Sequence, residues 1–559
     1  MAHLPLHLRH GHGPRGWHAQ WLRIVLVVLT ALPLAVYIFY VLQFGVNIPW
    51  WDEWAFVPIL HSMLTGHLTF AQLWAQHNED RILFPNLIEL VLASLTRYNV
   101  EVELIASAGF QVLTFLAIAL LYRRRHVGPA WGLIPVSAML FSLVQSYNML
   151  SGFALLWSLG LFGLALAVVA LDHLPGHWWA LPVALIGAVL ASYSGFQGLL
   201  VWPAALPYLV DPGTTWRTRG IWTGLGAVAW LVYFAGLNLQ PSGIGGSSVY
   251  FALEHPLAAG RYLLVLVGSV IPVPLSTATF LVGGVILALS AVAFVWSCTS
   301  RRVRTDPALR FPAALLIYGV LFALATTVGR SSFGTLEATS PRYTTSVLVL
   351  LTGLYLVLLR WSRHTPHQPT MVGSTLLGTC GLIIAVQFVA SMQSGWQTGP
   401  QARSARLLAA DLVVNLDRAP PSLVQDFVYP YPGPFLPAQV NVLERYHLSI
   451  FGTPAASVDA RLGVVPGGAL ARSLEAPPSV EQLLRRSRSD ARAWAILSTI
   501  YESRGDLQAA FPRRSVPFAL SLLRWATTSG VGSDGDSVFL RPYRSELDQL
   551  LQAATSSAS

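Results

Sequence analysis

The chain has 559 residues, of which 54% are hydrophobic and only 11% are charged, and its formal net charge is +9. Soluble domains contain about 25% charged residues, so this composition excludes an ordinary soluble protein and indicates an integral membrane protein. The basic residues form short clusters between apolar runs rather than one polar face, which argues against a nucleic-acid partner. Two cysteines, Cys298 and Cys380, lie in or beside apolar runs, so no disulfide framework is indicated.

Apolar runs of near-spanning length recur from residue 21 to residue 391 and predict an all-α polytopic membrane domain with about 11 transmembrane helices. The first run is long and lacks a small-residue cleavage site, which favours a retained helix over a cleaved signal peptide. The predicted spans are 21–43, 102–122, 130–147, 152–171, 178–193, 196–210, 220–238, 278–298, 311–329, 344–360 and 371–391.

Every basic cluster falls in a loop of the same parity, which sets the orientation, because cytoplasmic loops carry an excess of Lys and Arg. This parity places the N-terminal segment 1–20 in the cytoplasm. Two further apolar stretches, 82–98 and 258–275, would break this parity as crossings, so we expect helices in the outer interface there. The predicted cytoplasmic clusters are Arg123–Arg125, Arg217 and Arg219, Arg301–Arg304 with Arg310, and Arg360 with Arg363.

The external face then receives the first loop, 44–101, and everything after residue 391. The tail, 392–559, is more polar and predicts a small α-rich external, periplasmic domain. Within it, Trp494, Leu497 and Tyr501 have the spacing of the first helix of a tetratricopeptide repeat. A single copy cannot stack on a neighbour, so an ordinary helical hairpin is the expectation.

Ionisable residues are almost absent from the spans away from their ends, which weighs against an ion-coupled transporter. They gather instead in the first external loop. Asp52 and Glu53, among Trp50, Trp51 and Trp54, are the catalytic candidates, because a carboxylate near the bilayer can accept a proton or coordinate a cation. The alternative is that this pair only caps or solvates an interfacial helix.

A second polar cluster in the same loop favours a functional role for the carboxylate pair. It consists of His77, Asn78, Glu79, Asp80 and Arg81. Later on the same face come Arg330 and the pair Arg342-Tyr343. Guanidinium groups match phosphate oxygens, so a lipid phosphate is the expected ligand, with snorkelling to headgroups as the alternative.

This arrangement resembles the GT-C superfamily of polyprenyl-phosphate-sugar glycosyltransferases, which includes the protein O-mannosyltransferases and the aminoarabinose transferases of lipid A. It is most similar to a bacterial branch whose loop reads Asp-Glu-Trp and then His-Asn-Glu-His-Arg before Phe-Pro. The chain departs from that pattern at Asp80, where the branch usually has His. The resemblance covers about residues 20–455. Its motifs are Trp51–Trp54, His77–Arg81 with Phe84-Pro85, Gln145–Asn148 with Gly152-Phe153, Gly198–Pro203, Gly329-Arg330, Ser340–Tyr343 and Leu448–Phe451.

The resemblance implies a multi-pass glycosyltransferase of the cytoplasmic (inner) membrane, which moves a sugar from a polyprenyl-phosphate carrier to a glycan, lipid or protein acceptor at the external face. Asp52, or failing that Glu53, would take the acceptor proton in a single displacement. Arg330 and Arg342, with Tyr343, would hold the phosphate, while His77, Asn78, Glu79 and Arg81 would shape the donor pocket. A divalent cation bridging carboxylate and phosphate is compatible with this chemistry, although no dedicated ligand set is visible.

Two alternatives stay open at this point. A lipid-linked glycan flippase, or another non-catalytic envelope component, would use the same arginines and need no carboxylate base. An O-antigen ligase or polymerase would be expected to carry its key Arg and His on a large late external loop, whereas the late loop here, 329–345, is short.

Overall fold

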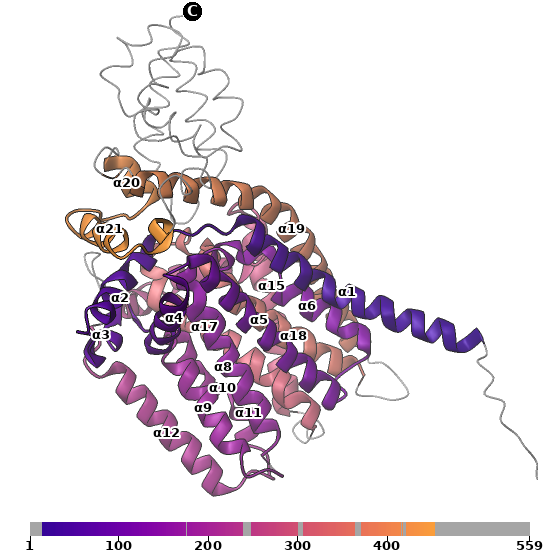
Figure 1. Ribbon diagram of the computed structural model, residues 1–559. Coiled ribbons are helices and arrows are strands. Elements are labelled where there is room, and N and C mark those ends of the chain that lie inside the picture. Colours follow the sequence, from indigo (N-terminus) through magenta and orange to yellow (C-terminus); the bar gives the residue numbers. More distant parts are fainter. Residues whose placement is uncertain are drawn as a thin grey trace, which may run out of the picture.

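The computed structural model describes residues 14–174, 176–238, 248–299, 306–363, 371–414, 416 and 421–452. Within these ranges the chain is a bundle of helices with a single two-stranded hairpin (Figure 1). Eight helices in the described part of the chain are long and apolar enough to cross a membrane. The all-α membrane class predicted from the sequence is therefore confirmed for the described residues.

The elements follow one another in this order. Up to residue 210 they are α1 (Pro14–Phe44), η1 (Trp51–Phe56), α2 (Val57–Leu64), α3 (Phe70–Leu73), β1 (Gln76–His77), β2 (Asp80–Arg81), α4 (Leu83–Thr96), α5 (Val100–Arg124), α6 (Leu133–Leu140), α7 (Ser146–Met149), η4 (Gly152–Ala154), α8 (Leu155–Asp172), α9 (Ala180–Ser192), η5 (Phe196–Leu200), α10 (Val201–Ala204) and α11 (Leu206–Leu209). After residue 210 come α12 (Trp216–Phe234), α13 (Ser248–Glu254), α14 (Pro256–Gly268), α15 (Thr277–Thr299), α17 (Arg310–Arg330), η7 (Ser331–Phe333), η8 (Glu337–Thr339), η9 (Pro341–Tyr343), α18 (Thr344–Ser362), α19 (Met371–Val414), α20 (Pro421–Phe427), α21 (Phe435–Arg445) and η10 (Ser449–Gly452).

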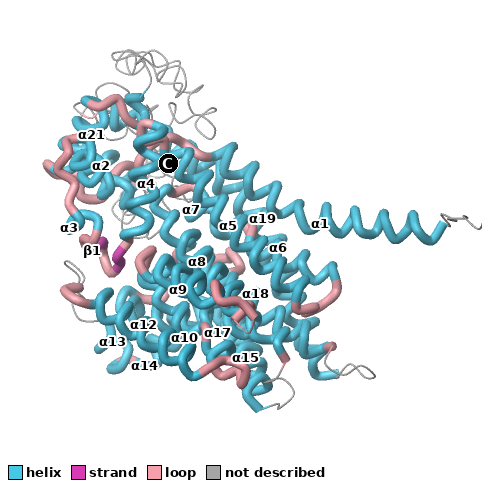
Figure 2. The backbone as a smooth tube through the Cα atoms, turned by 60° about the horizontal axis from the view of Figure 1, so that its bottom comes forward, coloured by secondary structure: helices cyan, strands magenta, loops and turns pink. Residues whose placement is uncertain are grey.

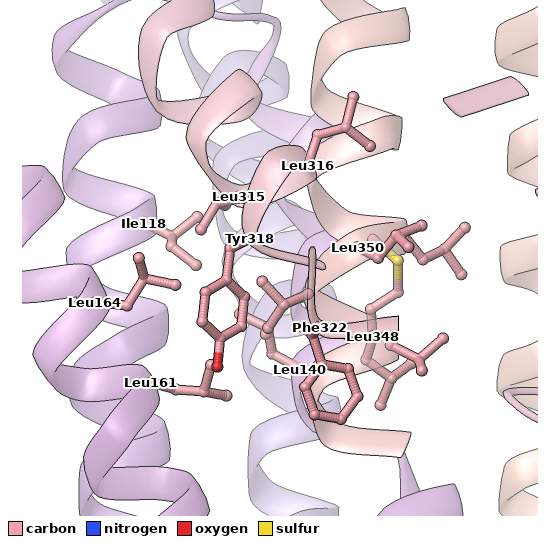
Figure 3. Packing of buried hydrophobic residues seen from close by; sticks show 14 of the residues in the cluster. Ile118, Leu140, Leu161, Leu164, Leu315, Leu316, Tyr318, Phe322, Leu348 and Leu350 are labelled. Carbon is pink, nitrogen blue, oxygen red and sulfur yellow. The ribbon is translucent and has the colours of Figure 1, made fainter. Parts of the chain in front are cut away.

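The main core lies between the long helices, and α18 is its centre because every residue from Thr344 to Leu359 is buried. Figure 3 shows how α5, α6, α8, α17 and α18 contribute to it, with the Tyr318 ring of α17 among leucines and Ile118. Tyr318 and Phe322 are both buried. A helix that is apolar all round belongs inside a bundle rather than on its surface.

Glycine pairs allow some helices to approach closely. A methyl group on Gly268 of α14 would lie 1.9 Å from the Thr279 carbonyl oxygen, and one on Gly283 of α15 would lie 1.9 Å from the Leu264 carbonyl oxygen. Both neighbours are backbone atoms, which cannot move aside as a flexible side chain does. Small residues at such crossings are the usual basis of tight helix packing in membranes.

We therefore expect Gly283→Ala to destabilise the protein by about 1–3 kcal/mol, the usual cost of overpacking a core. Thermal unfolding in neutral detergent measures this effect. Gly284→Ala is the matched control, because a methyl group there would meet only the Leu264 Cδ2 atom, at 3.8 Å. Equal melting temperatures for the two variants would contradict the packing argument.

The basic clusters meet at one end of the bundle. Arg125 pairs with Asp172 at 2.8 Å, and Arg310 pairs with Asp211 at 2.7 Å. Arg360 contacts Asp306 at 2.8 Å and donates to the His126 carbonyl oxygen at 3.2 Å, which joins the ends of α5 and α18 to the start of α17. Arg301, Arg302 and Arg304 lie outside the described residues.

The first loop lies at the opposite end, where α5 begins. The Val100 N–H donates to the Asn47 side chain at 2.9 Å, and α5 then runs to the basic end at Arg124. Figure 1 shows α2, α3, α4 and α21 gathered around this end, and Figure 2 places the hairpin there between α3 and α12.

The described tail packs on the first loop instead of standing apart. Helix α19 continues without a break past the predicted boundary at residue 391 to Val414. A second core then joins Trp54, Leu60 and Tyr98 of the loop to Leu443 and Ile450 of the tail. The Ser449 N–H also donates to the Arg97 carbonyl oxygen at 2.8 Å. The predicted helical hairpin around Trp494 lies outside the described residues.

Candidate functional site

Glu53 is the buried member of the carboxylate pair. Its carboxylate accepts from the Trp50 N–H at 2.9 Å, from the Ser151 hydroxyl at 2.9 Å and from the Phe153 N–H at 3.3 Å. Burial raises the pKa of Glu53, and the Trp50 N–H and Ser151 hydroxyl oppose that change. With both oxygens engaged, Glu53 ties the first loop to the turn before α8.

Asp52 is the accessible member of the pair, since 44% of its side chain is exposed. Its Oδ1 atom lies 3.9 Å from the Nε2 atom of His77. The His77 ring packs on Phe153, with ring centroids 4.8 Å apart. Asp52, His77 and Phe153 all line one cavity of about 240 Å³. A ligand in that cavity could therefore reach the Asp52 carboxylate.

Two further acids line the same cavity, Glu89 of α4 and Glu103 of α5. Both are buried. Gly152 leaves room for Glu103 and Glu53, because a methyl group at that position would lie 2.5 Å from Glu103 Oε2 and 3.5 Å from Glu53 Cδ. Neither glutamate was a predicted site residue, although an acid inside an apolar stretch is a signal that could have indicated Glu89.

Burial raises the pKa of Glu89 well above its usual value, and the charge of Glu53 adds to this. The folded protein then holds the Glu89 proton more tightly than the unfolded chain does. Stability should fall as the pH rises from about 4.3, the ordinary value for Glu, through the raised pKa.

Glu89→Gln removes this penalty and keeps the shape of the side chain. We expect it to raise the melting temperature at pH 8 and to leave it nearly unchanged at pH 4. The corresponding gain in the free energy of unfolding at pH 8 is about 1.4 kcal/mol for each unit by which the pKa is raised. Thermal unfolding at the two pH values measures the difference. Glu101→Gln, at an exposed position of the first turn of α5, should show no such difference. Equal destabilisation of Glu89→Gln at both pH values would contradict the assignment.

The hairpin β1–β2 carries the second predicted cluster. Gln76 pairs with Arg81 and His77 pairs with Asp80, so Asn78 and Glu79 form the turn, where Asn78 has a φ of 50°. Asn78 is exposed, and its carbonyl oxygen accepts from the Gln76 amide. The hairpin therefore places His77 beside Asp52 and directs Glu79 to another part of the bundle.

Glu79 pairs with Arg330 at the end of α17, with 2.5 Å between Oε2 and Nη2. The Asp80 carboxylate accepts from the Phe196 N–H at 2.6 Å. Burial raises the pKa of Asp80, and that N–H is the main opposing influence. Asp80, which stands where the bacterial sequences that this loop resembles usually have His, thus anchors the hairpin to η5.

Arg81 is buried, and each of its side-chain nitrogens donates to a backbone carbonyl oxygen. The acceptors are Tyr233 at 2.8 Å, Trp74 at 2.7 Å and Ala235 at 2.6 Å. The guanidinium carbon also lies 4.9 Å from the centre of the Trp74 ring. These contacts fasten the hairpin to the end of α12, which is a positioning role.

Arg342 pairs with Glu337, and Tyr343 donates to the same carboxylate at 2.9 Å. The Asn148 amide donates to the Arg342 carbonyl oxygen at 3.0 Å. Each of the two arginines predicted to bind phosphate is thus held by a carboxylate, Arg330 by Glu79 and Arg342 by Glu337. Both arginines lie at the end of the bundle that carries the first loop.

Within the described ranges, no group of three or more His, Cys, Asp or Glu side chains is arranged to hold a metal ion. Comparison of the chain with family models, with curated proteins and with solved structures finds no match. The case for a function therefore rests on the geometry of the site.

Proposed function

We propose that the protein is a GT-C-type glycosyltransferase that uses a polyprenyl-phosphate sugar as its donor. The observation that carries the proposal is the position of Asp52, exposed at an acidic cavity and 3.9 Å from His77. A general base must be reachable by the group whose proton it takes, and Asp52 meets that condition while Glu53 is engaged by three donors.

The chain would cross the cytoplasmic membrane 11 times, with the Asp52 end external. The basic ion pairs lie at the end of the bundle opposite the first loop, which supports this orientation, because the end that carries the basic clusters would be cytoplasmic. Three of the predicted spans are not among the eight long apolar helices of the described residues. Helix α9 has only 13 residues, α12 has 19 but carries Arg217 and Arg219 in its first turn, and 196–210 is divided into η5, α10 and α11. In the proposed arrangement all three cross the membrane, and α12, most of whose residues are exposed, does so at the surface of the bundle.

Cysteine labelling in intact cells tests this topology, with Cys298 and Cys380 replaced by Ser. We expect Thr65→Cys, in the first loop, to react with a membrane-impermeant maleimide. Gly176→Cys, beside the Asp172–Arg125 pair, should react only after permeabilisation, because that end would face the cytoplasm. Both positions are exposed, so burial within the protein does not block either reaction. The reverse pattern would place the acidic cavity in the cytoplasm and remove the external donor site.

The proposed step is a single displacement at the anomeric carbon. Asp52 accepts the proton of the acceptor hydroxyl, the acceptor oxygen bonds to the anomeric carbon, and the bond from that carbon to the carrier phosphate breaks. The leaving polyprenyl monophosphate gains negative charge, which Arg330 and Arg342 would stabilise. His77 would position the Asp52 carboxylate.

The direct test supplies purified full-length protein with polyprenyl-phosphate sugars and measures the carrier monophosphate released. Release that depends on Asp52 supports a glycosyltransferase. A parallel reaction supplies a polyprenyl-diphosphate-linked glycan, and release of polyprenyl diphosphate from it would indicate a ligase or polymerase instead. Carrier movement across the bilayer without release, and independent of Asp52, would indicate a flippase.

A further inference from the structure

The wall of the acidic cavity presents hydrogen-bond acceptors that lack donors. Among the described residues, nothing donates to the carboxyl group of Glu89 or of Glu103, and Glu103 Oε1 is a buried atom without a partner. Asn86, which is 3% exposed, donates its amide to the Leu73 carbonyl oxygen, while its own amide oxygen receives no hydrogen bond from any described residue. Buried acceptors normally have partners, and a donor group on a ligand in the cavity would supply one for Glu103 Oε1.

The possible donors on the same wall are largely occupied. Tyr98 directs its hydroxyl to the Glu53 carbonyl oxygen at 3.5 Å. The Gln72 amide donates to the Ser62 hydroxyl, and the Gln76 amide to the Asn238 carbonyl oxygen. Among the residues that the structure describes, no Lys or Arg side chain lines the cavity, so four acids face it with His77 as the one potential cation in that set. Hydrogen bonding therefore favours a ligand rich in donors, and a cationic ligand would in addition stabilise the ionised form of these acids.

We propose that this cavity binds a protonated primary amine carried by one of the two substrates. An ammonium group offers three donors and no acceptor, which matches Glu89, Glu103 and Asn86. A hydroxyl offers one donor and adds acceptors that face carboxylates. The inference rests on the proposed transferase function, for which it names the chemical class of one substrate. The amine would belong either to the transferred sugar or to the acceptor.

The test is equilibrium binding to the purified full-length protein, followed by tryptophan fluorescence or calorimetry. Glucosamine and glucose form a matched pair of probes, since they differ in one amine for one hydroxyl. We expect glucosamine to bind at least about tenfold more tightly, the effect of a charge-assisted contact worth about 1.4 kcal/mol. Glu103→Gln and Glu89→Gln should each remove that preference, while Glu101→Gln, exposed on the same helix as Glu103, should keep it.

Ethanolamine distinguishes the two sources of the amine. Competition by ethanolamine as strong as that by glucosamine assigns the amine to the acceptor, whereas preference for glucosamine assigns it to the sugar. Equal affinity for glucosamine and glucose would overturn the proposal. So would a preference that survives in folded Glu103→Gln and Glu89→Gln variants.

Because this binding requires no transfer, its failure is separate from failure of the proposed function. Amine binding without any release of carrier phosphate would remove the transferase function and keep the amine site. Release of carrier phosphate without a preference for the amine would keep the transferase function and remove the amine site.

Discussion

Asp52→Asn is expected to lower the single-turnover rate of sugar transfer by about 10²–10⁴-fold, the usual contribution of a general base. This corresponds to about 3–5 kcal/mol of transition-state free energy. Asparagine keeps the shape of the side chain and its contact with His77 but cannot accept the acceptor proton. Donor affinity should be nearly unchanged, because the arginines that would hold the phosphate come from other elements. Rapid-quench measurement of carrier phosphate release gives the rate.

Glu53→Gln is the companion variant, and the structure predicts a different outcome for it. The carboxylate of Glu53 accepts three hydrogen bonds and is 4% exposed. Its loss should lower the melting temperature as well as the rate, whereas Asp52→Asn should leave stability unchanged. If both variants transferred sugar within about twofold of wild type, neither carboxylate would be a base, and the flippase alternative would be favoured.

The spans that are long and apolar could be predicted from the sequence, because burial in lipid requires an unbroken apolar run. All eight long apolar helices found among the described residues correspond to predicted spans. The prediction of one helix over 196–210 was too simple. Pro203 and Pro207 lack the N–H of a helix interior, and the chain there forms η5, α10 and α11. The predicted interfacial stretches 82–98 and 258–275 contain α4 and α14.

The extent of the tail could not be predicted from hydropathy. Polar residues replace apolar ones after residue 391, yet α19 continues to Val414 because its later turns pack on the first loop. That contact joins residues more than 350 positions apart, as in the hydrogen bond from Arg403 to the Gln43 carbonyl oxygen. Local composition carries no information about such a partner.

The candidate site was predictable in its first-loop residues and not in its full set of acids. The Asp52-Glu53 pair stands out because charge is rare in this chain. Glu103, in contrast, is near the start of a span, where an acid at a helix N-terminus is ordinary. Only the fold brings Glu103 and Glu89 to the cavity of Asp52. Glu53, unlike Asp52, is engaged by hydrogen bonds from Ser151 and Phe153, which are distant in sequence. The different roles of the two acids could therefore not be predicted from the first loop alone.

Arg330→Lys is expected to lower the transfer rate by about 10²–10³-fold, the usual effect of losing one donor to a developing oxyanion. Lysine keeps the charge but loses the planar fork that matches two phosphate oxygens. Arg330 contacts the Glu79 carboxylate at 2.5 Å and lies over the Phe333 ring, 5.6 Å from its centre. These two contacts orient the guanidinium. Turnover on a defined polyprenyl-phosphate sugar measures the effect.

Glu79→Gln separates the two consequences of that ion pair. If Glu79 orients Arg330, the neutral side chain should lower kcat with little change in KM, because the guanidinium loses its fixed position. If Glu79 competes with the phosphate, the same variant should lower KM. We expect the first outcome, since Glu79 is itself held on a short hairpin whose Asp80 and Arg81 are both anchored to the bundle. Full turnover in both Arg330→Lys and Arg342→Ala would leave the arginines as headgroup contacts. The departing phosphate would then need stabilisation from another part of the chain.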